Sequence, residues 1–187
     1  MAVPIQKRFV TIDEYHRMGE QGVFPLDARL ELIRGEIIEM SPIGPRHAGS
    51  VRRFIRNFSA RLSSYAIVDA QNPVEMREQE SEPQPDITLL RLQDDLYSTA
   101  TPTPGDTLLV VEVADSSLSF DRKVKMHLYA EAGIPESWLV DLNSETLFVF
   151  RRPSPEGYQD VRAYRRGESV APEAFPGVSF AIEEILG

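Results

Sequence analysis

The sequence contains no cysteine, which excludes disulfide bonds and thiolate metal ligands. Histidine is scarce too, with three residues in a chain of 187. A metal site in this chain would therefore use carboxylate oxygens or one of these histidines. Sites built from oxygen alone suit Mg²⁺, Mn²⁺ or Ca²⁺ better than Zn²⁺.

Long apolar runs are also absent. No stretch reaches the roughly 18 apolar residues that a membrane-spanning helix needs. The first eight residues hold no apolar segment of the kind found in signal peptides, so we expect a cytoplasmic protein. The length and a hydrophobic content of 42% predict a single domain, residues 1–187, with one core.

Positive charge is in deficit, and the formal net charge is −9. Domains that bind nucleic acids are usually basic, so this balance counts against a general polyanion binder. A local basic face or a bound divalent cation can override the mean charge. The composition therefore does not exclude a nucleic-acid substrate.

Hydrophobic periodicity and turn residues predict short strands and helices in alternation. The expected helices cover residues 12–18, with Thr11 as N-cap, 47–64 and 121–132. The expected strands cover residues 30–33, 36–40, 66–70, 74–77, 86–92, 107–114, 137–141 and 146–150. The tail, 158–164 and 170–182, is expected to form a further hairpin and an irregular end. This order predicts an α/β or α+β fold, a sheet with helices packed on it.

Glu112 lies inside the most apolar of these strands, residues 107–113. Such a run is typical of a central strand that is buried on both faces. A carboxylate there is costly unless it is paired or bound to a metal. The alternative is a glutamate at the strand end that reaches solvent or pairs with an arginine.

Asp86 opens another apolar strand, directly after Pro85. Taken alone it is better explained as a turn residue at a strand entrance. Adjacent strands lie about 4.8 Å apart, however, so Asp86 and Glu112 at matching heights could hold one cation together.

Lys125 lies in the middle of the apolar arc of the helix expected at 121–132, whereas Lys123 points to solvent. A lysine that faces the core is unusual. Its side chain either packs its stem and reaches water with the ammonium, or holds the ammonium near the two carboxylates. In the second case Lys125 would orient an attacking water or stabilise charge on a phosphate. An aspartate, a glutamate and a lysine around a divalent ion are typical of a site that cleaves phosphodiester bonds.

At this point the sequence resembles the PD-(D/E)XK phosphodiesterase superfamily, and more closely its bacterial Uma-type branch, long treated as a domain of unknown function. The resemblance covers most of the chain. It rests on Tyr15, residues 30–37, 41–42, 46–47, 84–86 and 111–117, Asp121, Lys125, Tyr129, and residues 132–141 and 176–178. The longest ordered part, from VEVADSS to AGIPESWLVD, is the most specific.

The resemblance implies a restriction-endonuclease-like αβββαβ core, here with an added N-terminal helix–hairpin and C-terminal hairpin. It implies that Asp86 and Glu112 bind Mg²⁺ (or Mn²⁺) and that Lys125 is the catalytic lysine. One departure matters. The superfamily usually places its lysine two residues after the glutamate, where this chain has Ala114. The branch is similar to cases in which the lysine has moved to the following helix.

Three further residues match positions of this branch. Glu31 is an additional candidate metal ligand, and its alternative is a surface glutamate of a hairpin. His47 is a candidate substrate contact, and its alternative is a histidine satisfied at a helix start. Gln84 is a candidate contact from the segment before Asp86.

The helix expected at 47–64 carries arginines opposite its apolar side, among them Arg52, Arg53 and Arg56. These are candidate phosphate contacts, or an ordinary solvated face. Trp138 and Tyr129 are expected in the core rather than as platforms for bases.

The leading functional hypothesis is a magnesium-dependent endonuclease, a hydrolase acting on DNA, with a homo-oligomer such as a dimer allowing both strands to be cut. The alternatives are a non-catalytic nucleic-acid-binding or accessory protein with the same fold, and a phosphodiesterase acting on RNA or nucleotides.

Overall fold

A mixed six-stranded sheet forms the centre of the computed structural model, which describes residues 7–187. Its strands, in spatial order, are β3 (Ile67–Asp69), β4 (Ile87–Leu90), β5 (Thr107–Ala114), β6 (Glu136–Asp141), β7 (Thr146–Arg151) and β8 (Asp160–Tyr164). Neighbouring strands are antiparallel except β5 and β6, which are parallel. The expectation for the first eight residues falls mostly on residues 1–6, outside the described part.

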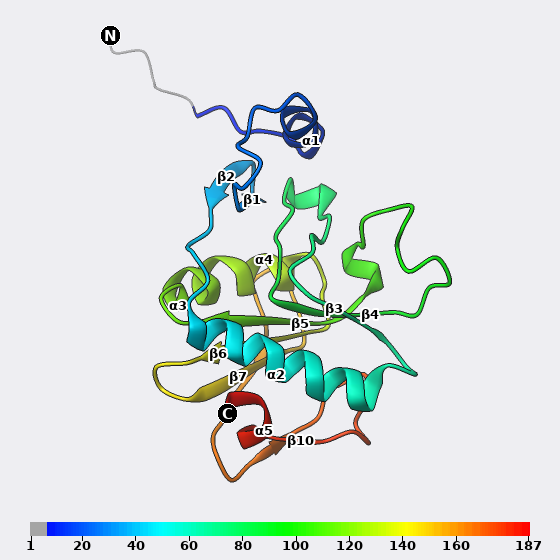
Figure 1. Ribbon diagram of the computed structural model, residues 1–187, viewed down its shortest axis with the longest axis vertical. Helices are drawn as coiled ribbons and strands as arrows, with labels where there is room; N and C mark the ends of the chain where they lie inside the picture. Colours follow the sequence, from blue (N-terminus) through cyan, green and yellow to red (C-terminus); the bar gives the residue numbers. More distant parts are fainter. Residues whose placement is uncertain (1–6) are drawn as a thin grey trace.

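Helices cover both faces of this sheet, as the predicted α/β class requires (Figure 1). On one face lies α2 (Pro45–Leu62), whose Phe54 and Phe58 pack against Trp138. The short C-terminal helix α5 (Ile182–Leu186) packs against α2. On the other face a continuous helical segment consists of α3 (Leu118–Phe120), the π-helical η3 (Asp121–Lys125) and α4 (Met126–Glu131).

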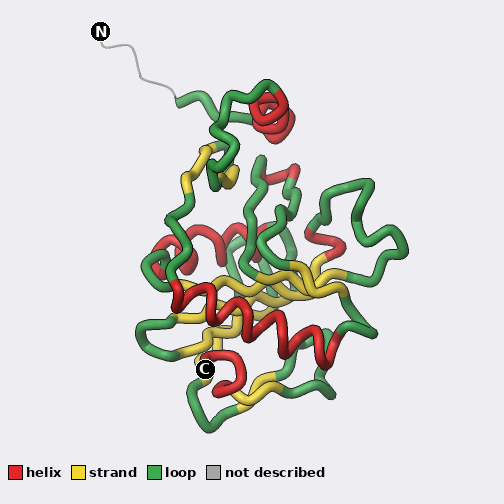
Figure 2. Tube along the Cα trace, viewed as in Figure 1, coloured by secondary structure: helices red, strands yellow, loops and turns green. Residues whose placement is uncertain are grey.

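An N-terminal unit stands apart from the main sheet (Figure 2). It consists of α1 (Ile12–Glu20) and a hairpin of β1 (Leu30–Ile33) and β2 (Glu36–Glu39). Thr11 caps α1 as predicted, in a reciprocal arrangement with Glu14. An antiparallel bridge between Leu32 and Glu82, and hydrogen bonds from the backbone N–H groups of Gly35 and Arg34 to Glu80 and Ser81, join the hairpin to the segment that leads into β4.

Strand β5 has the predicted position and burial. Its odd-numbered residues from Leu109 to Val113 face α2, and Val110 and Ala114 belong to the core under α4. Because the strand is buried on both faces, Glu112 lies in the interior with only 3% of its surface exposed.

Three expectations for the secondary structure were wrong. Residues 74–77 are not a strand. They lead, with one bridge between Met76 and Ser81, into the 3-10 turn η1 (Arg77–Gln79), because prolines interrupt the segment on both sides. Residues 160–164 extend the main sheet beside β7 instead of pairing within the tail, where β9 (Ser169–Val170) pairs with β10 (Phe180–Ala181).

The helix expected to begin at Asp121 begins three residues earlier, at Leu118. Among residues 7–187 no helix has the length and apolarity required to span a membrane.

Candidate functional site

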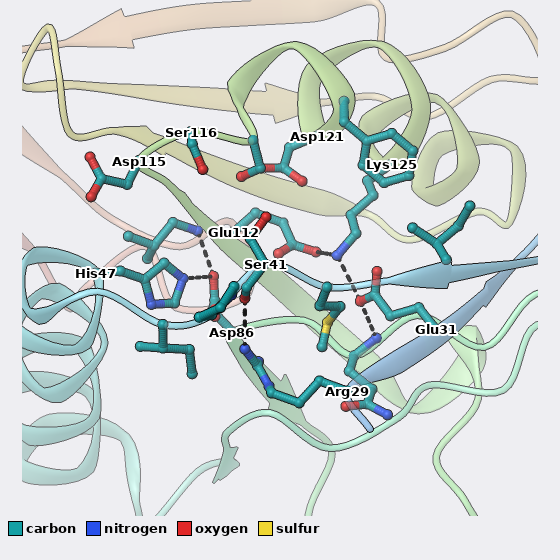
Figure 3. A pocket seen from close by; sticks show the side chains of 18 of the residues that line it. Arg29, Glu31, Ser41, His47, Asp86, Glu112, Asp115, Ser116, Asp121 and Lys125 are labelled. Carbon is teal, nitrogen blue, oxygen red and sulfur yellow. Dashed lines mark hydrogen bonds and ion pairs between the residues drawn. The ribbon is translucent and has the colours of Figure 1, made fainter. Parts of the chain in front are cut away.

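A cavity of about 380 Å³ opens between the N-terminal hairpin, the start of α2, the ends of β4 and β5, and the α3–η3 segment (Figure 3). Its charged and polar lining residues include Arg29, Glu31, Ser41, His47, Gln84, Asp86, Glu112, Asp115, Ser117, Asp121 and Lys125. The predicted carboxylates and lysine therefore share one cavity, although they come from separate parts of the chain.

Asp86 and Glu112 are brought level by the pairing of β4 with β5. The register pairs Ile87 with Val111, so the next position along places Asp86 beside Glu112. The backbone N–H of Val113 donates to Asp86 Oδ2 at 2.8 Å. The Nε2 of His47, from the first turn of α2, lies 3.0 Å from the same oxygen. These two contacts fix the orientation of the Asp86 carboxylate.

Lys125 reaches the same cavity from η3 and is 5% exposed. Its Nζ donates to Glu31 Oε1 at 2.8 Å and to Glu112 Oε1 at 3.1 Å. The alternative of an ammonium that escapes to water does not hold, because the ammonium is buried between two carboxylates. Glu31 is also buried, 1% exposed, and its Oε1 accepts the backbone N–H of Gln84 at 2.8 Å.

The position two residues after Glu112 is filled by Ala114, which is buried in the core beneath α4. The strand thus has no lysine at this position, and the ammonium beside Glu112 comes from Lys125 on η3 instead. Tyr129, one turn after Lys125 on α4, donates its hydroxyl to Glu112 Oε1 at 2.5 Å. Tyr129 and Trp138 are fully buried, as expected.

The electrostatics of the cavity are set by an excess of buried carboxylates. Burial raises the pKa of Glu112 well above its ordinary value; Lys125 opposes this rise, and Asp121, Asp86 and Glu31 add to it. Burial alone would lower the pKa of Lys125, but Glu112, Glu31 and Asp121 outweigh that effect and raise it. Lys125 therefore carries its charge at neutral pH.

Asp121 is a further residue of the cavity, which the sequence analysis did not select as a candidate. It lies in η3, 4% exposed, and accepts the Ser117 hydroxyl at 2.5 Å. Burial chiefly raises its pKa, and Lys125 opposes this. The signal was available in the spacing, because residues four apart on a helix lie on one face, so Asp121 accompanies Lys125.

Of the other candidates, His47 and Gln84 line the cavity and Arg52, Arg53 and Arg56 do not. Arg53 donates to the backbone oxygen of Leu186 at 2.5 Å and so ties α2 to the C-terminal helix. Arg52 and Arg56 are exposed on the outer side of α2. Contact of this face with phosphate remains a prediction.

The donor set of the cavity fits a hard divalent cation. Four buried carboxylates, those of Glu31, Asp86, Glu112 and Asp121, line the cavity together with one lysine, and oxygen ligands are those that Mg²⁺ prefers. No three of these carboxylates lie close together around one point, because the Lys125 ammonium lies between Glu31 and Glu112. Mg²⁺ commonly uses only one or two carboxylates and keeps several waters, so two carboxylates such as those of Asp86 and Glu112 could hold it.

Residues 12–183 match the family model described as "Uma2: Putative restriction endonuclease". The chain belongs to the Uma2 family. This confirms the resemblance drawn from residues 30–37, 84–86 and 111–141. The match spans both the N-terminal unit and the main sheet.

The Uma2 fold is shared with a solved structure from Anabaena variabilis ATCC 29413, described as a putative nuclease belonging to DUF820. The two superpose with a TM-score of 0.73 over 95% of this chain and 97% of the other, at 16% sequence identity. At this identity the likeness establishes the restriction-endonuclease-like fold and not the activity. No curated protein matches the sequence.

Proposed function

We propose that this Uma2 protein is a divalent-metal-dependent endonuclease that hydrolyses phosphodiester bonds in DNA. The observation that carries the proposal is the buried ammonium of Lys125, which contacts Glu112 and Glu31 in the cavity that Asp86 also lines. A structural ion pair needs one carboxylate, whereas this lysine is surrounded by several in a cavity open to a ligand.

In this proposal Asp86 and Glu112 hold Mg²⁺ or Mn²⁺, and Glu31 is an additional ligand. The metal would supply Lewis-acid chemistry, making water a better nucleophile and polarising the scissile phosphate. A cation also offsets the excess of buried negative charge described above.

The protein's own groups position the reaction. Lys125 orients the attacking water or stabilises the negative charge that grows on the phosphate. The Tyr129 hydroxyl holds Glu112, and the backbone N–H of Gln84 holds Glu31. His47 holds Asp86 and faces the cavity, where it can contact the substrate.

Plasmid cleavage by the purified protein tests the proposal. We expect cleavage with Mg²⁺ or Mn²⁺, none with EDTA, and none with Asp86→Asn or Lys125→Met. Lys123→Met is the matched control, because this exposed lysine lies on the same helical segment and should leave cleavage unchanged. Folded wild type that neither cleaves DNA nor binds Mg²⁺ by calorimetry would instead support a non-catalytic accessory protein.

The net charge of −9 favours one other substrate class, small nucleotides, for which little positive surface is needed. Cleavage of DNA through phosphate contacts should fall steeply as salt rises. Hydrolysis of a small nucleotide should change little over the same range.

In the same plasmid assay, linear product formed without a nicked intermediate would support a dimer that cuts both strands.

A further inference from the structure

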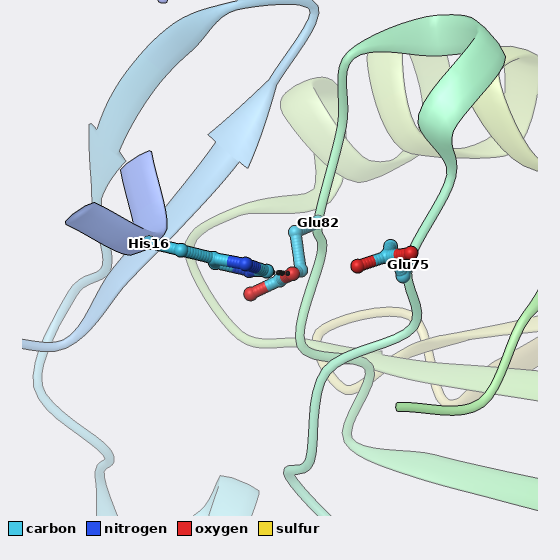
Figure 4. A group of neighbouring side chains, drawn as sticks. All are labelled: His16, Glu75 and Glu82. Carbon is cyan, nitrogen blue, oxygen red and sulfur yellow. Dashed lines mark hydrogen bonds and ion pairs between the residues drawn. The ribbon is translucent and has the colours of Figure 1, made fainter. Parts of the chain in front are cut away.

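A second group of potential metal ligands lies outside the cavity (Figure 4). His16 on α1, Glu75 in the loop after Pro73 and Glu82 before β4 come from three separate segments. One ligand atom from each lies within 4.8 Å of the other two, and His16 Nε2 lies 2.6 Å from Glu82 Oε2. Among residues 7–187 this is the only set of three histidine or carboxylate ligands gathered so closely.

We propose that these residues form a structural site for a divalent transition metal, with Zn²⁺ the best fit. The set joins one imidazole nitrogen to two carboxylate oxygens, a combination that Zn²⁺ accepts and that suits Mg²⁺ less well. The side chains of His16 and Glu82 are 36% and 9% exposed, and that of Glu75 is 16% exposed. An ion can therefore enter from the His16 side and keep a water as its fourth ligand.

The surrounding charges leave room for a cation. Arg77 donates to both carboxylate oxygens of Glu75, at 2.6 and 3.2 Å, and also reaches Asp13 at 3.0 Å, so an ion would share Glu75 with an arginine whose charge is divided between two carboxylates. Within residues 7–187, Glu82 has no ionic partner other than His16. Metal binding would exchange the single hydrogen bond between His16 and Glu82 for coordination of both groups.

The position of the group gives the ion a structural role. The backbones of Glu82 and Leu32 exchange two hydrogen bonds, of 2.7 and 3.4 Å, directly beside Glu31. An ion on His16, Glu75 and Glu82 would fasten α1 to the segment that carries Gln84 and Asp86 into the cavity. The inference does not depend on nuclease activity, and its test uses binding and stability alone.

The test measures Zn²⁺ binding by calorimetry and the Tm in full-length protein carrying Asp86→Asn, which weakens metal binding in the cavity. At free Zn²⁺ about 100 times Kd, we expect the Tm to rise by about 5 to 10 °C and one ion to bind per chain. His16→Gln should abolish both effects. His127→Gln is the matched control, an exposed histidine on α4 that should leave both unchanged.

Co²⁺ gives an independent readout, because its visible absorption bands report coordination by the protein. These bands should appear in the Asp86→Asn protein and disappear in His16→Gln. Glu75→Gln is a second variant if His16→Gln does not fold, and it should weaken Zn²⁺ binding at least tenfold. Equal Zn²⁺ binding in the parent and both variants, or no binding by the folded parent, would overturn the site.

Discussion

The ammonium of Lys125 lies 3.1 Å from Glu112 Oε1, although the lysine belongs to a helical segment and the glutamate to the central strand β5. The same ammonium lies 2.8 Å from Glu31 on the N-terminal hairpin. Lys125 thus links the helical segment, the central strand and the N-terminal hairpin, and the integrity of the cavity depends on its charge.

Loss of that charge should destabilise the fold. Lys125→Ala leaves Glu31 and Glu112 buried without their cation, and we expect it to lower the free energy of unfolding by about 3–5 kcal/mol. Urea denaturation in EDTA measures this. Lys123→Ala, at an exposed position, should change stability by less than about 0.5 kcal/mol. Equal effects of the two substitutions would show that Lys125 is not held by the buried carboxylates.

Asp121 should tune metal binding. It is buried in the same cavity and acts electrostatically on both Glu112 and Lys125. We expect Asp121→Asn to raise the Mg²⁺ concentration for half-maximal cleavage by about tenfold or more, as loss of a group beside metal ligands does. Asp115→Asn is the control, because Asp115 lines the cavity but is paired with Arg46. An unchanged Mg²⁺ requirement in Asp121→Asn would remove Asp121 from the site.

Glu136 should give stability a measurable pH dependence. It is fully buried in β6, and burial raises its pKa, while hydrogen bonds from Glu173, Trp138 and Arg151 oppose the rise. A carboxyl whose pKa is higher in the folded state binds its proton more tightly there. The free energy of unfolding should therefore fall as pH rises from the unfolded value of about 4.3 through the folded pKa.

Glu136→Gln should remove this contribution, so the difference in stability between wild type and variant should change with pH in urea titrations from about pH 4 to 8. Glu156→Gln, at an exposed position, is the matched control. A difference for Glu136→Gln that does not change with pH would contradict the raised pKa.

Gly35 should be intolerant of a side chain. It has φ +73° in the turn between β1 and β2, and an added Cβ would lie 2.6 Å from Phe9 Cβ. We expect Gly35→Ala to cost at least about 1–2 kcal/mol, the penalty of a left-handed backbone alone. Gly19→Ala is the opposite case, because the site in α1 is open and alanine should stabilise the helix by about 0.5–1 kcal/mol. Thermal unfolding of the two variants should shift in opposite directions.

The sequence predicted best the elements whose pattern is local. Strand β5 was recognisable because a run of eight residues that is apolar except at Thr107 and Glu112 has few other places in a fold. Lys125 was recognisable because a lysine within an apolar helical arc needs a buried partner. The hairpin around Gly35 was predictable because two short runs of residues that favour strands flank a two-residue turn.

The remaining features depend on contacts between distant segments. Residues 160–164 pair with β7 because that strand offers an open edge, and their own pattern does not reveal this choice. The apolar residues Val74 and Met76 suggested a strand. They are buried in the core beneath α4, although their backbone forms a loop. The approach of His16 to Glu82, 66 positions away, has no local signature.

The attachment of the N-terminal hairpin gives the cavity a weak wall. Glu31 belongs to a two-stranded ladder outside the main sheet. Its attachments include the Leu32–Glu82 bridge, hydrogen bonds from the backbone N–H groups of Gly35 and Arg34 to Glu80 and Ser81, and the contacts of Glu31 with Gln84 and Lys125. We expect this wall to open by itself, at a lower free energy than global unfolding, releasing one ligand while Asp86 and Glu112 stay in place. Amide exchange should then be faster in residues 30–39 than in β5, and bound metal should slow it. Metal binding at the cavity and local opening of the hairpin would then report the same equilibrium.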